Sequence, residues 1–409
     1  MTTLLRSPES LYAAYDRFPT QKGASTHIAR FAPALFRHAG GGLLYVLGDS
    51  SMPQRQLEEN VEIVRFRREI PNFLERAIAF QSALSRIVDA ARGSLRIAHF
   101  RDPWSGPPLV TANRSWAAVY EVNALPSIEL PNAFPSVAPR TLAKIRAVEL
   151  HCLEACDAVV TPSRTTASML ERLGVNRAKI TVIPNGADPV PSQPRPVDAP
   201  ERYILYFGAM QRWQGVDTLL RAFARLTDLD ELRLVVCGSA RSRDARRLES
   251  LASKLGLSDR VVWQYELHDR ELRPWLANAE LSVAPLRECA RNVEQGCAPL
   301  KIVESLAAGV PVVASNLPPV REIVTDGIEG RLVVPDRPAD LARAIRVLLH
   351  SPQRREEMSI AARRRVEESL TWDHALAALT ALYERLDSLP HQRGRIALRP
   401  EISIEGARA

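Results

Sequence analysis

One stretch of the chain decides the fold: Pro299-Leu-Lys-Ile-Val-Glu-Ser-Leu-Ala-Ala-Gly-Val-Pro-Val-Val-Ala-Ser315. Read in order, it predicts a short helix, a glycine that ends the helix, and a buried strand. Small residues stand directly before it, and a proline suits the first helical position because no amide hydrogen bond is lost there. Free amides and the dipole at such a helix start favour a phosphate group. The stretch therefore predicts an anion site.

Two charged residues of this helix share one face. Lys301 and Glu304 are three positions apart, which places a cation beside a carboxylate. Such a pair suits a diphosphate and the hydroxyls of a sugar, respectively. A surface ion pair between the two side chains explains the same spacing, and the sequence leaves this alternative open.

The chain around this stretch is built from alternating strands and helices. Its 409 residues are too many for one core and fit two domains of about 150 to 200 residues each. The alternation stops between residues 185 and 200, which are rich in Pro, Gly and Asp, and then restarts. We therefore expect two doubly wound parallel sheets joined by one linker, with their ligand sites facing each other across a cleft.

The expected elements of each half follow from the apolar patterns. In the first half we expect strands at 11–15, 43–47, 61–66, 95–100, 117–122, 158–161 and 180–183, and helices at 25–38, 73–91, 139–155 and 165–173. In the second half we expect strands at 203–207, 232–237, 260–264, 281–284, 310–314 and 331–334, and helices at 215–226, 243–255, 269–277, 299–308, 339–350, 352–370 and 372–386.

Three ordered blocks resemble the family 4 retaining glycosyltransferases of the GT-B fold. They are residues 299–335, residues 203–220, and residues 158–163 with 182–188. The resemblance runs from residue 10 to residue 388 and implies an α/β protein with two Rossmann-like, doubly wound domains. It divides the chain into an acceptor-binding domain (1–190), a nucleotide-sugar-binding domain (201–370), a helix returning to the first domain (371–388) and a mobile tail (389–409).

The same resemblance implies the activity. A protein of this family transfers a hexosyl unit from a nucleoside diphosphate sugar to an acceptor and retains the anomeric configuration. Protein groups neutralise the leaving group, so no metal and no cofactor are expected beyond the sugar nucleotide, which we expect to carry UDP or GDP. Two alternatives stay open: a nucleotide-sugar epimerase of the same fold, and a nucleotide-sugar-binding protein that has lost catalysis.

The chain departs from the family pattern at three positions. By resemblance, Glu304 binds the ribose hydroxyls. The partner glutamate eight positions earlier is replaced by Gly296. In the block of residues 203–220, called the glycine block below, the family's arginine and lysine correspond to Ala209 and Gln214. The charge that holds the diphosphate must therefore come from elsewhere in the chain.

Lys301 is the expected source of that charge, and Arg291 and Arg212 are further candidates. Glycine turns and the helix start should supply the other contacts to the donor. These contacts are expected at Gly23, Ala24, Gly208, Met210, Gln211, Gln214, Gly296, Cys297, Ala298, Pro299 and Leu300.

In the first domain, Gly23 and Ala24 stand before a helix that Ser25 or Thr26 would cap. This turn resembles the family's glycine loop against the diphosphate and the acceptor, and Ser25 and His27 are the expected acceptor contacts. A plain helix start with a packing histidine is the alternative.

Two strand ends of the first domain carry further candidates. Arg101 and Asp102 end one strand, where Asp102 could orient the acceptor or act as a base, and Trp104 follows as an acceptor contact. A surface ion pair between Arg101 and Asp102 is equally compatible with the sequence. Glu121 and Asn123 end the next strand; Asn123 aligns with a position that is often histidine in the family, and Glu121 is the candidate carboxylate.

Composition limits the partners. A net charge of +7, from 54 basic and 47 acidic residues, is mild and suits anionic ligands such as nucleotide sugars. No nucleic-acid-binding module, secretory signal or apolar run of about 18 residues is recognisable. We expect a cytoplasmic protein with a small soluble acceptor, and leave weak peripheral membrane association and a homodimer open.

The five cysteines predict reduced thiols, because the count is odd and no secretion signal accompanies it. Cys152 and Cys156, with His151, are close on a predicted helix and could ligate a metal, but a packed helix face explains them better. We therefore expect no metal site.

Overall fold

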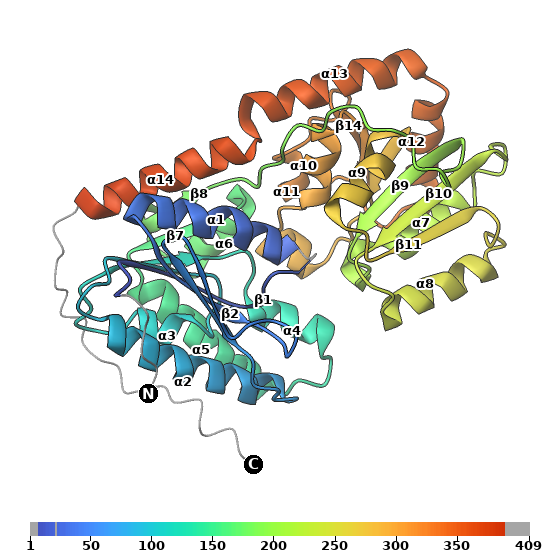
Figure 1. Cartoon of the computed structure of the whole chain (residues 1–409). Coiled ribbons are helices and arrows are strands. Elements are labelled where there is room, and N and C mark those ends of the chain that lie inside the picture. Colours follow the sequence, from blue (N-terminus) through green and yellow to red (C-terminus); the bar gives the residue numbers. More distant parts are fainter. Residues whose placement is uncertain (1–6, 21–22, 389–409) are drawn as a thin grey trace. The chain divides into compact units, whose positions relative to one another are not determined.

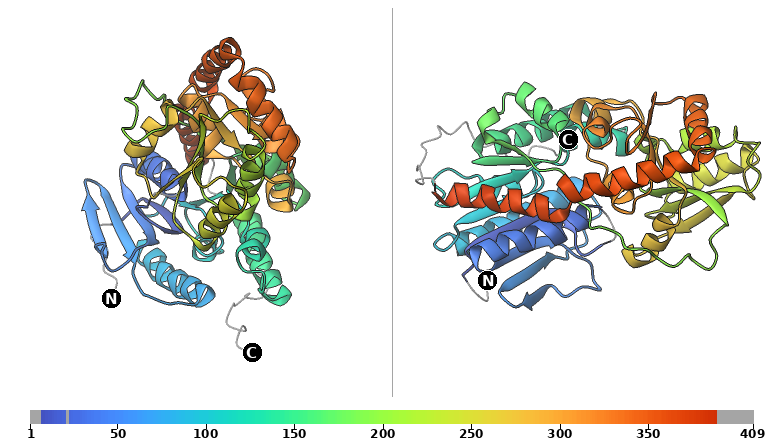
Figure 2. Two further views of the ribbon diagram at one scale, coloured as in Figure 1. Left: turned by 90° about the vertical axis from the view of Figure 1, so that its right-hand side faces the viewer. Right: turned by 90° about the horizontal axis from the view of Figure 1, so that it is seen from above.

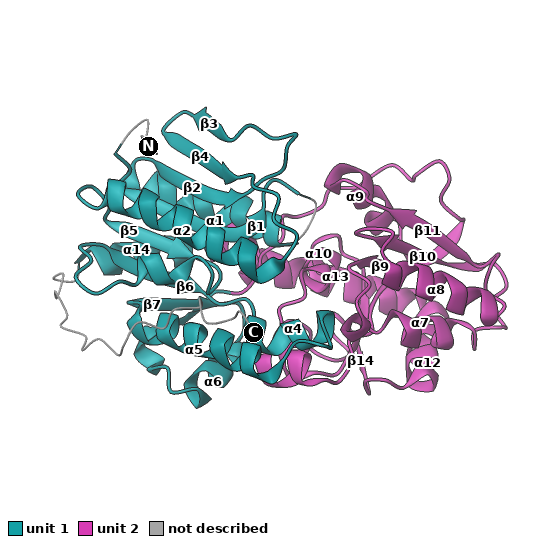
Figure 3. Ribbon diagram, turned by 90° about the horizontal axis from the view of Figure 1, so that it is seen from below, with its two compact units in different colours: residues 1–183, 376–409 teal, residues 184–375 magenta. Residues whose placement is uncertain are grey.

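The computed structural model describes residues 7–20 and 23–388. The chain forms two compact units, which Figure 3 distinguishes by colour. Unit 1 consists of the residues up to Ile183 together with those from Leu376 onwards, and unit 2 is the continuous segment Pro184–Ala375. The predicted mobile tail, 389–409, lies outside the described residues.

Unit 1 is built on an eight-stranded sheet in the order β3-β4-β2-β1-β5-β6-β7-β8. Its neighbouring strands are parallel except for β3, which pairs antiparallel with β4 at the edge. The strands are β1 Ser10–Arg17, β2 Gly42–Leu47, β3 Arg55–Glu58, β4 Val61–Phe66, β5 Ile97–Phe100, β6 Ala117–Glu121, β7 Ala158–Thr161 and β8 Ile180–Val182. The carboxyl ends of β1, β5 and β6 therefore meet at one edge of the sheet.

Helices cover both faces of this sheet. They are α1 Gly23–Ala39, α2 Phe73–Ala91, α3 Gly106–Leu109, α4 Pro126–Ala133, α5 Pro139–Ala155, α6 Arg164–Arg172, the short η1 Arg177–Lys179, and α14 Trp372–Ser388, which enters unit 1 at Leu376. Side chains of α2, α3 and α5 share one core with the strands. Helices α1 and α14 lie side by side (Figures 1 and 2), and His38 of α1 contacts Asp387 of α14 at 2.9 Å.

Helix α2 shows why these segments fold as they do. The side chain of Asn72 accepts hydrogen bonds from the amides of Leu74 and Glu75 and so caps the helix start. Apolar residues then recur every three or four positions and are almost completely buried: Ala77, Phe80, Leu84, Ile87, Val88 and Ala91. A stripe of this width is what a helix needs to pack on a sheet.

Unit 2 repeats the plan with a six-stranded parallel sheet in the order β11-β10-β9-β12-β13-β14. The strands are β9 Arg202–Gly208, β10 Leu232–Gly238, β11 Val261–Tyr265, β12 Leu281–Ala284, β13 Val312–Ser315 and β14 Gly330–Val333. Residues between Pro184 and Glu201 form no helix or strand, as expected for the linker.

Helices α7, α8 and α12 pack on one face of the second sheet, and α9, α10 and α13 contribute to the cores on the other. The helices are η2 Arg212–Gln214, α7 Val216–Phe223, α8 Arg243–Lys254, α9 Asp269–Ala277, the π-helical turn η3 Arg291–Gln295, α10 Leu300–Ala307, α11 Pro318–Arg321, α12 Pro338–Leu349 and α13 Pro352–Ser369. Within the described part of the chain, no helix is long and apolar enough to cross a membrane.

The structure confirms the doubly wound α/β fold and every predicted strand and helix, with end points that shift by a few residues. The prediction that Pro299 is the first residue of its helix is wrong. Pro299 is the N-cap, with extended backbone (ψ 101°), and the helix begins at Leu300. Elements without a prediction are β3, α3, α4, α11 and the short turns η1, η2 and η3.

Candidate functional site

In unit 2, the ammonium group of Lys301 reaches across to the glycine block. It donates hydrogen bonds to the Tyr206 hydroxyl (2.9 Å) and to Oε1 of Gln214 (2.7 Å). It also lies 4.1 Å from the centre of the Tyr206 ring. A side chain at Gly208 would start 3.6 Å from this nitrogen, so the glycine leaves space beside the cation. Burial lowers the pKa of Lys301 to about 7, against a smaller opposing effect of Glu304.

Glu304 lies on the same helix but is not paired with Lys301. Among the described residues, none donates a hydrogen bond to its carboxylate or forms an ion pair with it. Burial raises the pKa of Glu304 to about 7, with a further increase from Asp269 and an opposing effect of Lys301. Because no ion pair joins Glu304 to Lys301, the surface-pair alternative is wrong. The residue is partly exposed, so its unpaired oxygens can accept hydrogen bonds from hydroxyl groups.

The 296–299 loop connects η3 to α10. Gly296 begins it with a φ of 86°, a backbone conformation that other residues rarely adopt. Cys297 is buried, and burial raises the pKa of its thiol to about 11. The carbonyl oxygen of Ala298 accepts a hydrogen bond from Nδ2 of Asn185 (2.8 Å). No carboxylate replaces the family's glutamate at Gly296 itself.

The other predicted donor residues follow β9. Gly208 ends the strand, Met210 is buried, and Gln211 is the N-cap of η2. Arg212 is exposed on η2, and Gln214 ends that turn against Lys301. The structure therefore brings the glycine block and the start of α10 together within unit 2.

Arg291 opens the π-helical turn η3 and lies against Trp213 of the glycine block. Its guanidinium carbon is 5.2 Å from the indole ring, and Nη1 donates to Oδ1 of Asn292 (2.9 Å). The fully buried Asn292 in turn donates from Nδ2 to the carbonyl of Trp213 (3.0 Å). Arg291 thus lies beside the glycine block, and Asn292 ties η3 to it.

In unit 1, the carboxylate of Glu121 is the centre of a buried polar network. Its Oε1 accepts hydrogen bonds from Nε of Arg101 (3.0 Å) and Nδ2 of Asn123 (2.6 Å), and its Oε2 accepts from the Tyr12 hydroxyl (2.7 Å). Nδ1 of His27 and Nε2 of His99 each lie 3.3 Å from the carboxylate.

The ionised form of Glu121 is strongly favoured. Burial raises its pKa, but Arg101 and the imidazoles of His27 and His99 outweigh burial and hold the pKa well below its usual range. A carboxylate surrounded by so many donors is a poor base and a poor nucleophile. Its position indicates that it orients the groups around it.

Arg101 extends this network to the predicted glycine turn. Nη1 donates to the carbonyl of Ala24 (2.8 Å) and lies 3.4 Å from Oδ2 of Asp16. The turn, the end of β5 and the end of β6 are therefore joined through one guanidinium group. The structure brings Ala24, His27, Arg101, Glu121 and Asn123 together.

Sequence reasoning missed several members of these two networks. Tyr206 lies in the block of residues 203–220 but carried no prediction, and Tyr12 and His99 lie on predicted strands. Tyr383 of α14 contacts Nδ1 of His99 through its hydroxyl (2.7 Å), although 284 positions separate the two. Buried aromatic hydroxyls and imidazoles on strands were the available signal, because such groups need partners.

Two predicted residues have other roles in the structure. Asp102 accepts hydrogen bonds from the amides of Tyr15, Trp104 and Ser105 and from the Ser105 hydroxyl, and burial raises its pKa to about 6. It organises the turn after β5 and does not pair with Arg101, so that alternative is wrong. Trp104 is 3% exposed and packs against Tyr15 and Phe73, which leaves its indole no open face.

The start of α1 also differs from the expectation. The helix begins at Gly23, so Ser25 lies inside it, and the Ser25 hydroxyl accepts a hydrogen bond from the amide of Thr20 (2.9 Å). His27 is 5% exposed and lies between Glu121 and the ring of Phe31. Both side chains therefore serve the internal structure of unit 1.

The thiols and the candidate metal groups can be placed as well. All five cysteines are free thiols, and only Cys289 is partly exposed. Cys152 and Cys156 are buried on and just after α5. Over residues 7–20 and 23–388, no cluster of three His, Cys, Asp or Glu side chains could hold a metal ion.

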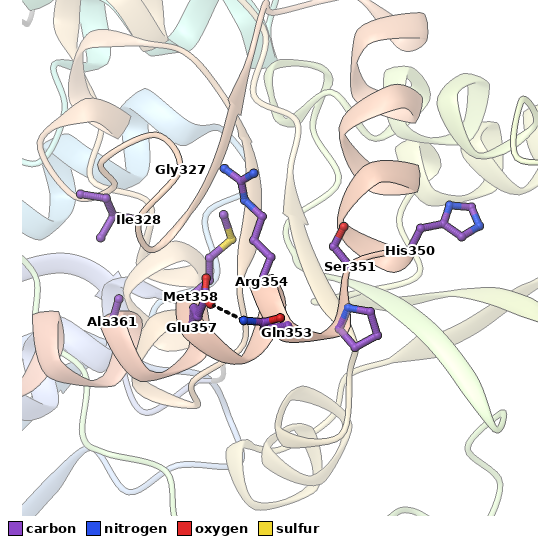
Figure 4. A pocket seen from close by; sticks show the side chains of 10 residues that line it. Gly327, Ile328, His350, Ser351, Gln353, Arg354, Glu357, Met358 and Ala361 are labelled. Carbon is purple, nitrogen blue, oxygen red and sulfur yellow. Dashed lines mark hydrogen bonds between the residues drawn. The ribbon is translucent and has the colours of Figure 1, made fainter.

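A separate pocket of about 710 Å³ lies at the start of α13 in unit 2 (Figure 4). Its walls include Gly327, Ile328, His350 and Arg354. None of the described residues that line it is a predicted site residue.

Comparisons with known proteins agree with this architecture. A family model described as Glycosyltransferase Family 4 matches residues 22–190, and one described as Glycosyl transferases group 1 matches residues 192–365. A D-inositol 3-phosphate glycosyltransferase from Xylanimonas cellulosilytica is 33% identical over 255 residues, which cover 58% of this chain and 58% of that protein. An MMP alpha-(1->4)-mannosyltransferase from Mycolicibacterium hassiacum is 33% identical over 226 residues, which cover 54% and 52%. The chain thus spans little more than half the length of these relatives.

Solved structures share the fold at low sequence identity. Sucrose-phosphate synthase from Thermosynechococcus elongatus has a TM-score of 0.75 at 20% identity, covering 93% of this chain and 99% of that one. The Anabaena protein HepE, solved in complex with UDP-glucose, has a TM-score of 0.72 at 16% identity, covering 93% and 100%. With one family model on each half, the chain belongs to the family 4 glycosyltransferases of the GT-B fold.

Proposed function

We propose that this protein transfers a hexosyl unit from a nucleoside diphosphate sugar to an acceptor, with retention of the anomeric configuration. The observation that carries the proposal is the position of Lys301. Its ammonium group lies beside Gly208 and reaches Gln214, the position from which the family's lysine would extend. In this proposal, Lys301 of α10 supplies the positive charge that the glycine block lacks.

The donor would be held by groups of unit 2. Lys301 would neutralise the diphosphate, the 296–299 loop and the end of β9 would offer main-chain amides, and the unpaired carboxylate of Glu304 would accept the ribose hydroxyls. UDP or GDP is the proposed nucleotide. HepE, a fold neighbour, was solved with UDP-glucose.

The proposed chemistry needs no protein nucleophile. The bond between the anomeric carbon and the diphosphate oxygen breaks while the acceptor oxygen bonds to the same face of the sugar. The acceptor proton then leaves with the diphosphate or passes to solvent. Glu121 would be a poor nucleophile, because its oxygens already accept three hydrogen bonds. The positive charge of Lys301 would neutralise the negative charge of the departing diphosphate, so the proposal includes no metal.

The proposed acceptor is a small soluble molecule bound by unit 1. Arg101 and Asn123 end neighbouring strands and are held by Glu121, and Ala24 lies in the same network. The half-buried amide of Asn123 suits an acceptor with hydroxyl groups, and the buried guanidinium group of Arg101 would hold Glu121 and the Ala24 turn in place around it. One relative of the chain is named D-inositol 3-phosphate glycosyltransferase.

A binding protein without catalysis is the second candidate, and one observation favours it. Gly296 places no carboxylate where the family has one for the transferred sugar. Such a protein would bind the sugar nucleotide and leave it intact.

A two-step experiment tests the proposal. A thermal-shift panel of UDP-, GDP-, ADP- and dTDP-sugars should show one donor class that raises the melting temperature, because ligand binding stabilises the folded state. Incubation of that donor should then release the nucleoside diphosphate slowly in water and faster with an acceptor, and NMR should show an unchanged anomeric configuration. Binding without release would favour the second candidate, an inverted product would refute retention, and an epimerised donor would favour the epimerase.

A further inference from the structure

The chain enters unit 2 through a segment that is tied to the 296–299 loop. Asn185, the second residue of unit 2, is 5% exposed. Its Nδ2 donates a hydrogen bond of 2.8 Å to the carbonyl of Ala298, a contact that joins positions 113 residues apart. Lys301 and Glu304 follow this loop directly.

The same segment is confined on its other side. The amide of Ala187 donates to the carbonyl of Leu370 (2.9 Å), at the end of α13. A side chain at Gly186 would start 2.4 Å from the amide nitrogen of Trp372, so only glycine fits against the start of α14. Residues 185–187 therefore lie between the 296–299 loop and the point where the chain is about to leave unit 2.

In the described part of the chain, the side chain of Asn185 makes one hydrogen bond, the one to Ala298. The Ala298 carbonyl can only accept, so the nitrogen of the amide must face it. The oxygen, Oδ1, is buried and has no partner among the described residues. The contact to Ala298 is therefore the whole contribution of this side chain to hydrogen bonding, which makes it separable by substitution.

We propose that Asn185 is a positioning residue that couples the 296–299 loop to the segment through which the chain enters unit 2. The inference rests on the proposed function, because the loop matters only if it holds the diphosphate of a donor. A diphosphate bound by the 296–299 loop would fix the position of the Ala298 carbonyl. Through the hydrogen bond from Asn185, it would also restrict the motion of Gly186 and Ala187. By reciprocity, a fixed segment 185–187 favours the loop conformation that binds.

The variant Asn185→Leu keeps the approximate shape of the side chain and removes the donor. Asn278→Leu is the matched control, because Nδ2 of Asn278 also donates to carbonyls of unit 2, those of Pro274 (2.9 Å) and Gln193 (3.2 Å), away from the loop. Thermal unfolding of both full-length variants measures the stability that each loses, and binding is compared at a temperature at which both are folded. A difference in ligand binding between them then reports position and not folding.

The first measurement is hydrogen exchange without ligand. Amides of residues 296–301 should exchange several-fold faster in Asn185→Leu than in the parent protein and at the parent rate in Asn278→Leu. Equal exchange in all three proteins would overturn the inference, whatever the protein binds.

The second measurement adds UDP and, in parallel, GDP. In the parent protein the bound nucleotide should slow exchange at both 296–301 and 185–187. In Asn185→Leu it should slow exchange only at 296–301, with about three- to tenfold weaker binding and a donor KM that rises more than kcat falls. Protection of 185–187 that persists in Asn185→Leu refutes the coupling alone. A parent protein that binds none of the panel nucleotides refutes the proposed donor, and the ligand-free comparison still decides the coupling.

Discussion

Lys301 carries the proposed function at the scale of single residues. Its ammonium group lies 2.7 Å from Oε1 of Gln214, so the two positions deliver side chains to one point. A positive charge at that point can therefore come from a side chain at position 301 or at position 214. Substitutions can thus test the charge independently of Lys301 itself.

The substitution Lys301→Ala should lower turnover at saturating donor by about tenfold or more, because the departing diphosphate loses its cation. Adding Gln214→Lys to this variant should recover part of the rate, since the new ammonium reaches the same point. Steady-state kinetics of both variants measures this. Lys254→Ala, at an exposed position at the end of α8, is the control and should leave the rate unchanged. An unchanged rate in Lys301→Ala would remove this residue from the mechanism.

The lowered pKa of Lys301 predicts a pH dependence of binding. Free Lys301, with a pKa of about 7, is mostly neutral above that pH, while a bound diphosphate favours the charged form. Binding then takes up a proton, so UDP affinity should fall as the pH rises from about 7 to about 9, by up to about tenfold per pH unit. Calorimetry in buffers of different ionisation enthalpy measures the proton directly. Lys301→Arg stays charged and should lose the proton uptake that Lys301 causes, so any slope that remains reports another group, such as Glu304 with its pKa of about 7. An unchanged slope and an unchanged proton uptake in this variant would exclude Lys301 as the titrating group.

At the scale of elements, helix α14 is joined to the first sheet by a hydrogen bond. The Tyr383 hydroxyl contacts His99 of β5, which lies against Glu121. Tyr383 is fully buried, so its hydroxyl has no access to water as an alternative partner. The helix therefore supports the polar network beneath the predicted acceptor groups.

Tyr383→Phe should lower the free energy of unfolding by about 1 to 2 kcal/mol, because His99 loses a partner in the core. Urea denaturation followed by circular dichroism measures it. Glu384→Gln, on an exposed position of the same helix, should change little. A Tyr383→Phe variant as stable as the parent protein would show that the contact does not stabilise α14.

The elements also show what the sequence can and cannot predict. Strong apolar periodicity placed α2, α5 and α9 at their observed ends, and the spacing of Lys301 and Glu304 placed two site residues on one helix. Strand β3 was missed because three of its four residues are polar and none is buried. Helix α4 was missed because it contains prolines and buries no residue.

The partners of the predicted site residues were harder to predict. The bond from Lys301 to Tyr206 joins positions 95 residues apart, and no local pattern encodes it. Asp102 and Trp104 lie at a strand end, which favoured a functional role, but local hydrogen bonds and packing use both side chains. Burial of a given side chain depends on the tertiary structure, so residue type and strand position alone could not predict that these two side chains are used internally.

At the scale of the whole molecule, the two units differ in continuity. Unit 2 is one segment, Pro184–Ala375, with its own cores, whereas unit 1 needs the residues from Leu376 onwards. Leu379, Leu382 and Tyr383 are buried, and a fragment that ends at Ile183 would lack them.

A fragment of residues 184–375 should therefore fold cooperatively and bind the same nucleoside diphosphate as the full chain. A fragment that ends at residue 183 should expose apolar surface and bind a hydrophobic dye, unless a peptide of residues 372–388 is added. Calorimetric unfolding and dye fluorescence measure the two outcomes. A 184–375 fragment that is unfolded, or folded without affinity for the nucleotide, would contradict the assignment of donor binding to unit 2.

The partly exposed thiol offers a practical use of this architecture. Cys289 is the one cysteine of the five that solvent reaches, and its carbonyl accepts the amides of Asn292 and Val293 at the start of η3. A maleimide fluorophore should consequently label the native chain at this position without any cysteine being engineered or removed. The dye would be separated from Gly296 by the turn η3. Its emission should then change when a sugar nucleotide binds, so that the protein with its native sequence serves as a screening reagent for such ligands.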